Sequence, residues 1–222
     1  MFAKLGILVL WALSVGYLLF FAPAEEQYTM DQMQALFTFE QTSMNPLVIA
    51  LFNSLGVWPL LFTAFLFTDP GGGRMKAWPF AVLSFGAGAF ALMPYIALRK
   101  ESPRLVKPGA VGSVTGSKVF AVLLVLLSAA LIIFAVGNFQ PGGLWDAFWS
   151  YHLVHTMVID FVLFALLAVY MIKKDAEKRH VTLTPKQWVL FSIPLLGTAL
   201  YLLYRPGWKK SRYSYKKDRR KK

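Results

Sequence analysis

The sequence predicts an all-α integral membrane protein with about six transmembrane helices. Hydrophobic residues make up 57% of the chain and charged residues 15%, whereas about 25% of the residues in an ordinary soluble domain are charged. Six apolar segments follow one another with short connections, and a helix of about 20 residues crosses the ~30 Å of hydrocarbon in a bilayer. The segments are Leu5–Phe21, Pro46–Thr68, Ala77–Leu98, Val119–Gly137, Ala147–Ile172 and Gln187–Tyr204.

Residues 1–24 are predicted to be a signal-anchor helix or a cleavable signal peptide. Lys4 precedes an apolar stretch, and residues 22–24 (Ala-Pro-Ala) have the small-residue pattern of a cleavage site. The apolar stretch is long for a signal peptide, so we favour an uncleaved first helix. Either form places the acidic extramembrane segment, residues 25–45, on the outer side of the membrane.

Residues 46–204 are predicted to form the membrane helical bundle. The last apolar segment is short and is interrupted by Pro194 and Gly197, so a tilted, kinked or re-entrant helix is expected there. Six crossings would place both chain ends inside, but the basic connections at 99–118 and 173–186 would then lie outside, against the positive-inside rule. A re-entrant last segment would bring both connections and the tail to one face, with the N-terminus outside. We favour six crossings, although the charge distribution leaves both arrangements open.

The tail Arg205–Lys222 is predicted to lie at the cytoplasmic or stromal face. It holds ten of the 23 Lys and Arg residues, and such a cluster directly after an apolar helix binds anionic lipid headgroups. Tyr213 and Tyr215 leave RNA contact as an alternative, but no nucleic-acid partner is expected. The chain has no cysteine, which excludes disulfides, thiolate metal sites and a cysteine nucleophile.

Two stretches of the chain share a plan that favours a 3 + 3 internal repeat. In each, an apolar helix leads to a turn containing an Asp, a Trp opens the next helix, and that helix closes on a Tyr four residues before an Arg. The corresponding residues are Asp69 and Asp175, Trp78 and Trp188, Tyr95 and Tyr201, and Arg99 and Arg205. An odd number of crossings in each unit would invert the second copy in the membrane. The alternative is that helical hairpins built from Leu, Phe and Ala resemble one another by composition.

Asp160 is the only formally charged residue inside a long apolar run. A carboxylate near the bilayer centre costs roughly 2.5–3.5 kcal/mol on insertion scales, so such residues are rare and usually functional. His152 and His155 are three residues apart and share one face of the same helix, nearer the membrane surface. Asp160, His155 and His152 are therefore the candidate catalytic residues.

Two interpretations of Asp160 stay open beside each other. It could hold and release a proton in acid–base or transport chemistry. It could instead hydrogen-bond a neighbouring helix and fix the bundle, which is the interpretation we favour. The expected partners in that case are Asn53, a Tyr, Ser192 or Thr198.

A third interpretation involves a cofactor, whose identity is unknown. A single His could ligate one chlorophyll magnesium, but three His residues in the chain are too few for the His boxes of a membrane di-iron site, and no metal site is expected. Trp58 precedes a mid-helix proline, about one turn from Asn53, and this pair is the first-half counterpart of the Asp160 region. His152, Asn53 and Trp58 are therefore the candidate cofactor-binding residues. The Gly71–Gly73 turn lacks the spacing and the Lys-Ser/Thr pair of a phosphate-binding loop.

The segments AWPFAVLSFGAGAFALMPYIALRK and IPLLGTALYLLYRP resemble small polytopic membrane proteins of cyanobacteria and plastids that have no assigned activity. The second half also resembles, loosely, the plastid membrane family required for neoxanthin formation, through the spacing of His155 and Asp160, the basic loop that follows, and the closing Pro-Leu-x-Gly…Tyr-Leu-Leu-x-Arg helix. The resemblance covers about half of the chain. It implies an integral protein in the thylakoid or plasma membrane of a cyanobacterium, or in a plastid membrane.

The expected function is that of a multi-spanning accessory or assembly protein of a photosynthetic membrane, without catalysis of its own. Its expected partners are the lipid bilayer and subunits of membrane complexes. One alternative is a membrane-embedded enzyme that uses Asp160 on an isoprenoid such as a carotenoid or a quinone. The other is a proton-coupled carrier.

Overall fold

A computed structural model describes residues 2–23, 29–69, 75–100 and 108–207. This part of the chain is helical throughout, with no strand, so the prediction of an all-α protein is confirmed. Five helices are long and apolar enough to cross a membrane, which fits an integral membrane protein. They are α1 (Phe2–Phe21), α3 (Pro46–Leu66), α4 (Ala77–Leu98), α6 (Lys118–Gly137) and α8 (His152–Arg179).

Five shorter helices complete the described chain: α2 (Met30–Thr38), α5 (Ala110–Thr115), α7 (Pro141–Ser150), α9 (Pro185–Phe191) and α10 (Leu196–Tyr204). The predicted segment Ala147–Ile172 is divided, because α7 ends one residue before Tyr151 and α8 begins one residue after it. Most of the basic tail, residues 208–222, and the acidic pair Glu25 and Glu26 lie outside the described residues.

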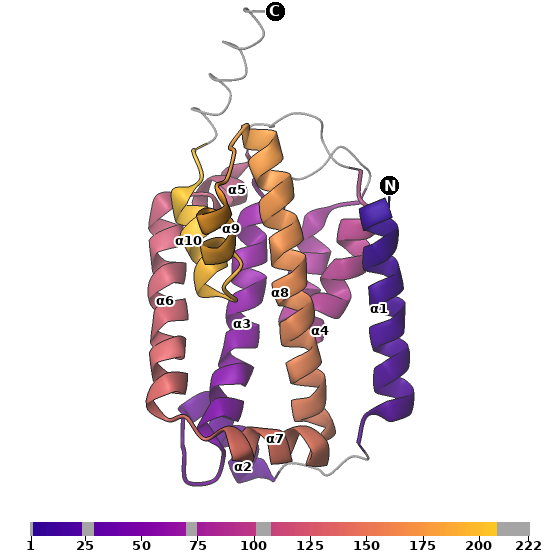
Figure 1. Cartoon of the computed structure of the whole chain (residues 1–222), viewed down its shortest axis with the longest axis vertical. Helices are drawn as coiled ribbons and strands as arrows, with labels where there is room; N and C mark the ends of the chain where they lie inside the picture. Colours follow the sequence, from indigo (N-terminus) through magenta and orange to yellow (C-terminus); the bar gives the residue numbers. More distant parts are fainter. Residues whose placement is uncertain (1, 24–28, 70–74, 101–107, 208–222) are drawn as a thin grey trace, which may run out of the picture.

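Helix α4 is a hairpin rather than a straight helix. Gly88 interrupts it with φ 56° and ψ −144°, and the chain reverses there. The rings of Phe80 and Tyr95 stack with centroids 4.8 Å apart, whereas 15 residues of continuous helix would separate them by ~22 Å. Both ends of α4 therefore lie at the same end of the bundle (Figure 1).

Helices α9 and α10 form a second hairpin at that end. The chain turns between them, where Leu195 has φ 60°. A Cβ on Gly197 would lie 2.4 Å from the Leu190 carbonyl oxygen, so the two arms can pack this closely only because residue 197 is glycine. Phe191 of the first arm packs its ring against Tyr201 of the second at 5.5 Å. A tilted, kinked or re-entrant helix was expected for the last apolar segment, and in the structure this segment folds back on itself.

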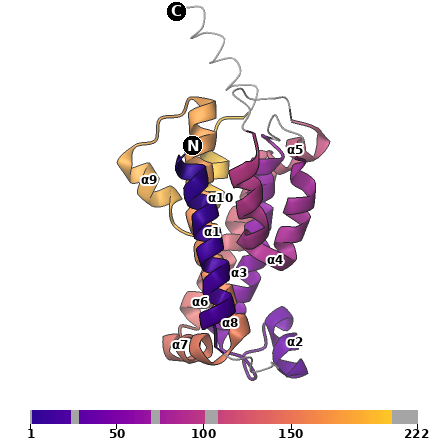
Figure 2. The same cartoon turned by 90° about the vertical axis from the view of Figure 1, so that its right-hand side faces the viewer.

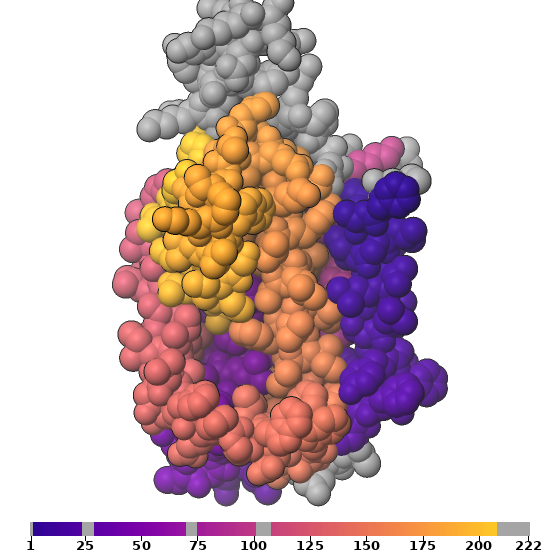
Figure 3. Space-filling model, viewed as in Figure 1, coloured from indigo at the N-terminus to yellow at the C-terminus, as the bar shows by residue number. Residues whose placement is uncertain are grey.

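The remaining long helices, α1, α3, α6 and α8, run the length of the molecule, and α2 and α7 lie across the end opposite the hairpins (Figure 1). Helices α3 and α8 pack against each other at the centre. The α4 hairpin packs beside α1, and α10 packs beside α6; a quarter turn of the molecule separates the two hairpins clearly (Figure 2). Because the second hairpin reaches only part of the way down, a hollow remains below it between α6 and α8, and α3 is visible through it (Figure 3).

Trp58 and Phe164, one from each half of the chain, are 106 positions apart, as are Asp69 and Asp175, and Arg99 and Arg205. Trp58 of α3 and Phe164 of α8 stack face to face at the centre, with ring centroids 5.6 Å apart and planes inclined by 6°. Near the hairpin end the contacts cross between the halves. Arg99 lies 4.0 Å from the Met171 sulfur, and Arg205 lies 5.3 Å from the centre of the Phe65 ring.

Candidate functional site

Asp160 lies two turns into α8 and caps the second arm of the first hairpin. Its Oδ1 accepts a hydrogen bond from the Ala89 N–H at 2.7 Å, and the Phe90 N–H also donates to the carboxyl group. These are the first free N–H groups of the arm that follows the break at Gly88. A carboxyl group at a helix N-terminus satisfies otherwise unpaired donors and complements the helix dipole. Asp160, 6% exposed, thus acts as an N-cap supplied by another helix.

Gly88 makes this contact possible. A Cβ placed on it would lie 1.8 Å from Asp160 Oδ2, well inside van der Waals distance, and its positive φ is one that other residues rarely adopt. The carboxyl group of Asp160 can therefore reach the hairpin tip only because residue 88 is glycine. The partners suggested by the sequence for a structural Asp160 were side chains, whereas the structure supplies backbone N–H groups.

His155 is fully buried at the opposite end of the bundle from the hairpin openings. Its Nδ1 lies 3.0 Å from the Phe148 carbonyl oxygen and its Nε2 lies 3.2 Å from the Tyr17 hydroxyl. A carbonyl oxygen only accepts, so Nδ1 carries the proton and Nε2 accepts from the tyrosine O–H. The imidazole also stacks on the Phe148 ring, with centroids 4.1 Å apart. With both nitrogens engaged, His155 ties α1 and α7 to the first turn of α8.

The other candidate residues from the sequence also hold chain segments together. His152 places Nδ1 3.3 Å from the Pro23 carbonyl oxygen, at the end of α1. Asn53 donates from Nδ2 to the carbonyl oxygens of Leu36 at 2.8 Å and Ile49 at 2.9 Å, which joins α2 to α3. The contacts of His152 with Pro23 and of Asn53 with Leu36 each join two elements, whereas the bond from Asn53 to Ile49 lies within α3.

Trp58 is completely buried in the stack with Phe164, and the Phe161 ring meets it edge-on at 5.8 Å. Its indole N–H has no hydrogen-bond partner among the described residues. The structure therefore does not join the candidate residues into one site: Asp160 contacts the hairpin tip, His155 contacts α1 and α7, and Trp58 lies in the central aromatic stack. Among the described residues no group of His, Asp and Glu could hold a metal ion.

The strongest charge cluster lies elsewhere, where α8 meets the end of α10. Asp175 Oδ2 accepts from Arg179 Nε and from the Tyr201 hydroxyl, both at 2.7 Å, and Oδ1 accepts from Arg205 at 3.1 Å. All four residues are buried. In the first half, Asp69 pairs with Arg99 at 3.8 Å and with Lys178. These clusters fasten each hairpin to the end of the bundle.

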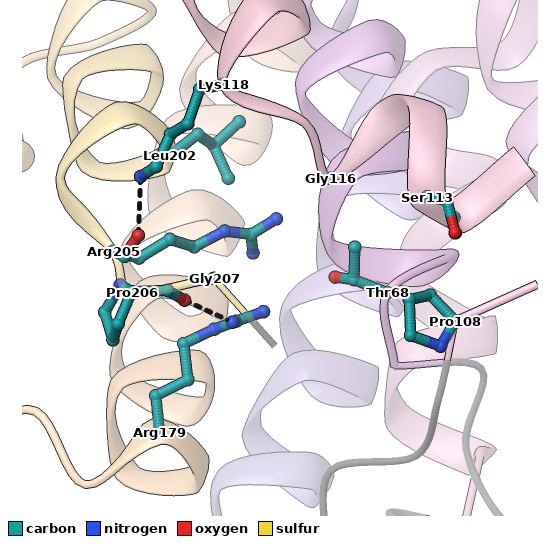
Figure 4. Close-up of a pocket in the computed structure, with 11 residues that line it drawn as sticks. Thr68, Pro108, Ser113, Gly116, Lys118, Arg179, Leu202, Arg205, Pro206 and Gly207 are labelled. Atoms are coloured by element: carbon teal, nitrogen blue, oxygen red, sulfur yellow. Dashed lines mark hydrogen bonds between the residues drawn. The ribbon is translucent and has the colours of Figure 1, made fainter. Parts of the chain in front are cut away.

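A cavity of about 70 Å³ lies beside the second cluster. The guanidinium groups of Arg179 and Arg205 extend toward it from one side, and Thr68 and Ser113 lie on the other (Figure 4). Lys118, at the start of α6, also lines it. The cavity is thus bordered by three cationic side chains.

Comparison with models of known families, with curated proteins and with solved structures found no match to this chain. The functional assignment therefore depends on the geometry described above.

Sequence reasoning located Asp160 but missed Gly88, Arg179 and the cavity. A signal for the hairpin was present, since the apolar segment Ala77–Leu98 has basic residues at both ends and a Gly-Ala-Gly sequence at its centre. The positive-inside rule would have placed both of those ends on the same face. No comparable signal identifies Arg179, because its role depends on how α8 and α10 pack.

Proposed function

We propose that the chain crosses the membrane four times, through α1, α3, α6 and α8, with α4 and α9–α10 entering and leaving at one face. All 23 Lys and Arg residues then lie in the first turn of α1, in the tail, or in the connections and helix ends at the hairpin face, which include the last two turns of α8 and the first turns of α6 and α9. The connections at the opposite end, residues 22–45 and 138–151, contain none. This distribution satisfies the positive-inside rule without conflict and makes the hairpin face the inner one.

In this topology each half contributes two crossings and one hairpin, an even number. The two copies of an internal repeat would then have the same orientation, related by an axis along the membrane normal, instead of the inversion expected from three crossings. The 106-residue correspondence and the central Trp58–Phe164 stack support this repeat.

The absence of cysteine makes the topology directly testable. A single cysteine at exposed Thr42 should react with a membrane-impermeant maleimide from outside, and one at exposed Lys186 from inside. Six crossings would place both positions outside. Labelling of both from the same side would therefore exclude the four-crossing arrangement.

For the function itself, we propose a multi-spanning accessory or assembly protein without catalysis of its own. The observation that carries this proposal is the 2.7 Å hydrogen bond from the Ala89 N–H to Asp160, which gives the intramembrane carboxyl group a structural role. The engagement of both His155 nitrogens supports the same conclusion. The proposed partners are subunits of a membrane complex, and anionic lipid headgroups at the tail.

The resemblance of the two hairpin segments to cyanobacterial and plastid proteins supports a photosynthetic membrane, either thylakoid or plasma membrane. Affinity purification of the tagged chain from such membranes tests this part. Reproducible recovery of complex subunits supports the proposal, whereas recovery of the chain alone contradicts it.

The alternative function is proton chemistry at Asp160, in an enzyme acting on an isoprenoid or in a proton-coupled carrier. The observation that favours it is that the carboxyl group is nearly buried where two half-helices meet, so gain of a proton there would alter the capping interaction. Both the enzyme and the carrier require Asp160 to gain and lose a proton, whereas the capping role requires only an oxygen atom that accepts a hydrogen bond.

Two substitutions at Asp160 separate these functions. Asp160→Asn keeps an oxygen that can accept from the Ala89 N–H but has no titratable proton, and Asp160→Leu removes the acceptor as well. The accessory proposal expects the Asn variant to retain its partners and the Leu variant to lose folded protein. Ser54→Ala is the matched control, since Ser54 is the position 106 residues earlier and its hydroxyl donates within its own helix, to the Leu51 carbonyl oxygen at 2.7 Å. If the Asn variant is folded but membrane carotenoid or quinone composition changes as in a deletion, the enzyme alternative replaces the proposal.

A further inference from the structure

The N-terminal helix α1 makes directed polar contacts with the rest of the bundle, although none of its residues is fully buried. Trp11 donates from its indole Nε1 to the Phe90 carbonyl oxygen at 3.0 Å. Nearly two turns further along α1, the Tyr17 hydroxyl lies 3.2 Å from His155 Nε2. A removable signal sequence needs apolar length and a cleavage pattern, but it needs no such partners in the folded protein.

One face of α1 packs on the α4 hairpin (Figure 1). The half-buried residues of α1 include a series spaced alternately by three and four positions: Lys4, Ile7, Trp11, Ser14 and Leu18. This spacing places the five side chains along one side of the helix. Lipid tails solvate apolar side chains as well as a neighbouring helix does, so close packing and hydrogen bonds decide which helices associate in a membrane. The bonds that α1 makes are therefore informative about its role.

The hydrogen bond from Trp11 has a specific cause in the sequence of α4. In an α-helix each carbonyl oxygen accepts from the N–H group four residues later, and the residue four positions after Phe90 is Pro94, inside α4. Proline has no backbone N–H group, so the Phe90 carbonyl oxygen lacks its usual helical donor. The Trp11 indole supplies a donor from another helix. A backbone carbonyl group left without a donor in the bilayer core is strongly unfavourable, and Trp11 prevents this.

Phe90 is held by its neighbours on both sides of its peptide backbone. Its N–H group donates to the Asp160 carboxyl group of α8, and its carbonyl oxygen accepts from Trp11 of α1. The break at Gly88 leaves the N–H group without a helical acceptor, and Pro94 leaves the carbonyl oxygen without a helical donor. The first turn of the second hairpin arm thus obtains from α8 and α1 the partners that its own chain does not provide.

We propose that α1 is a permanent helix of the mature protein, in which Trp11 replaces the N–H group that Pro94 lacks. The Ala-Pro-Ala pattern at residues 22–24, of which residue 24 lies outside the described residues, is then not a processing site. Removal of α1 would leave the Phe90 carbonyl oxygen and His155 Nε2 without their partners. Trp11 is a positioning residue for the hairpin tip, and this role is independent of the functions proposed above, because an accessory protein, an enzyme and a carrier would all need the same tip.

The first measurement is the intact mass of the full chain, purified through a C-terminal tag from the membranes of a bacterial host that has signal peptidase. We expect a product that still contains α1. A product that begins after the Ala-Pro-Ala pattern at residues 22–24 overturns the proposal.

The second measurement is a double-mutant cycle at Trp11 and Pro94, followed by thermal unfolding of the full chain in a mild detergent. Trp11→Phe keeps an aromatic ring but removes the N–H donor, and it should lower the unfolding temperature by about 2–4 °C. Pro94→Ala restores a backbone N–H group that can donate to the Phe90 carbonyl oxygen. In the Pro94→Ala chain, Trp11→Phe should therefore lower the unfolding temperature by much less than it does in the wild-type chain.

Trp78→Phe is the matched control for the cycle, because Trp78 lies at the start of the same hairpin and is 58% exposed. Its effect on the unfolding temperature should be small and the same with proline or alanine at position 94. A simple packing role for Trp11 would make Trp11→Phe equally harmful in both chains. Equal losses in the two chains, or no loss in either, would overturn the assignment of Trp11 as the missing donor.

Discussion

Replacing Gly88 by alanine is expected to open the first hairpin at its tip. The backbone at Gly88, with φ 56° and ψ −144°, costs a non-glycine residue about 1–3 kcal/mol. The new Cβ would also lie 1.8 Å from Asp160 Oδ2, so the carboxyl group must move away from the Ala89 N–H. A buried N–H left without an acceptor costs about a further 1–3 kcal/mol.

The total of about 2–6 kcal/mol is a large part of the 5–15 kcal/mol by which folded proteins are usually stable. For a chain of this length it corresponds to a decrease in unfolding temperature of roughly 5–20 °C. The measurement is thermal unfolding of the purified protein in a mild detergent, followed by the fraction that remains monodisperse.

Gly86→Ala is the matched control, two residues away in the first arm of the same hairpin. Nothing lies within 4 Å of a Cβ at Gly86, and alanine is favoured over glycine in a helix by about 1 kcal/mol. We therefore expect no loss of stability there. Adding Asp160→Ala to Gly88→Ala removes the clash, so the double variant should be more stable than the two separate losses predict. Equal melting of the Gly88 and Gly86 variants would refute the capping geometry.

Two further predictions concern the contacts at each end of the bundle. Asp175→Asn should lower the free energy of unfolding by about 3–5 kcal/mol, because it leaves the buried guanidinium groups without their counter-charge. The control is Glu177→Gln, in an exposed pair with Lys174 at 3.3 Å, which should change the unfolding temperature little. Equal effects of the two variants would contradict a structural role for the Asp175 cluster. Tyr17→Phe should lower the free energy of unfolding by about 0.5–1.5 kcal/mol through loss of its hydrogen bond to His155. In a chain that already carries His155→Phe, the same substitution should cost little or nothing further. Additive losses of stability in the double variant would argue against the hydrogen bond.

The sequence predicts where the helices are better than it predicts their direction. Ala77–Leu98 has the length and composition of a crossing, and hydropathy cannot detect the reversal, which depends on one backbone conformation at Gly88. The last segment is different, because Pro194 and Gly197 interrupt it visibly and its re-entrant form was among the expectations. Length and apolar content predict which segments form helices long enough for a bilayer, but the backbone conformation of one residue decides whether such a segment continues straight or reverses.

The prediction for the polar residues has the same limit. Asp160 could be singled out because a carboxyl group in an apolar run is rare. Its partner could not, since any residue other than proline supplies the N–H group that Ala89 supplies here. The cavity could not be predicted from the sequence either, because its cationic side chains come from α6, α8 and the end of α10, and only the packing of these helices brings them together.

Both hairpins open at the same end of the bundle, where α4, α9 and α10 lie beside the long helices, whereas α2 and α7 lie across the opposite end (Figure 1). On the proposed topology the hairpin arms would occupy one leaflet, and the other leaflet would contain the four crossing helices without them. The protein would then displace more lipid from one monolayer than from the other. On the proposed topology the inner leaflet would be the crowded one, so the protein would fit best where the bilayer bends to give that leaflet the larger area. Its position in a curved membrane would then follow from its shape, independently of any partner.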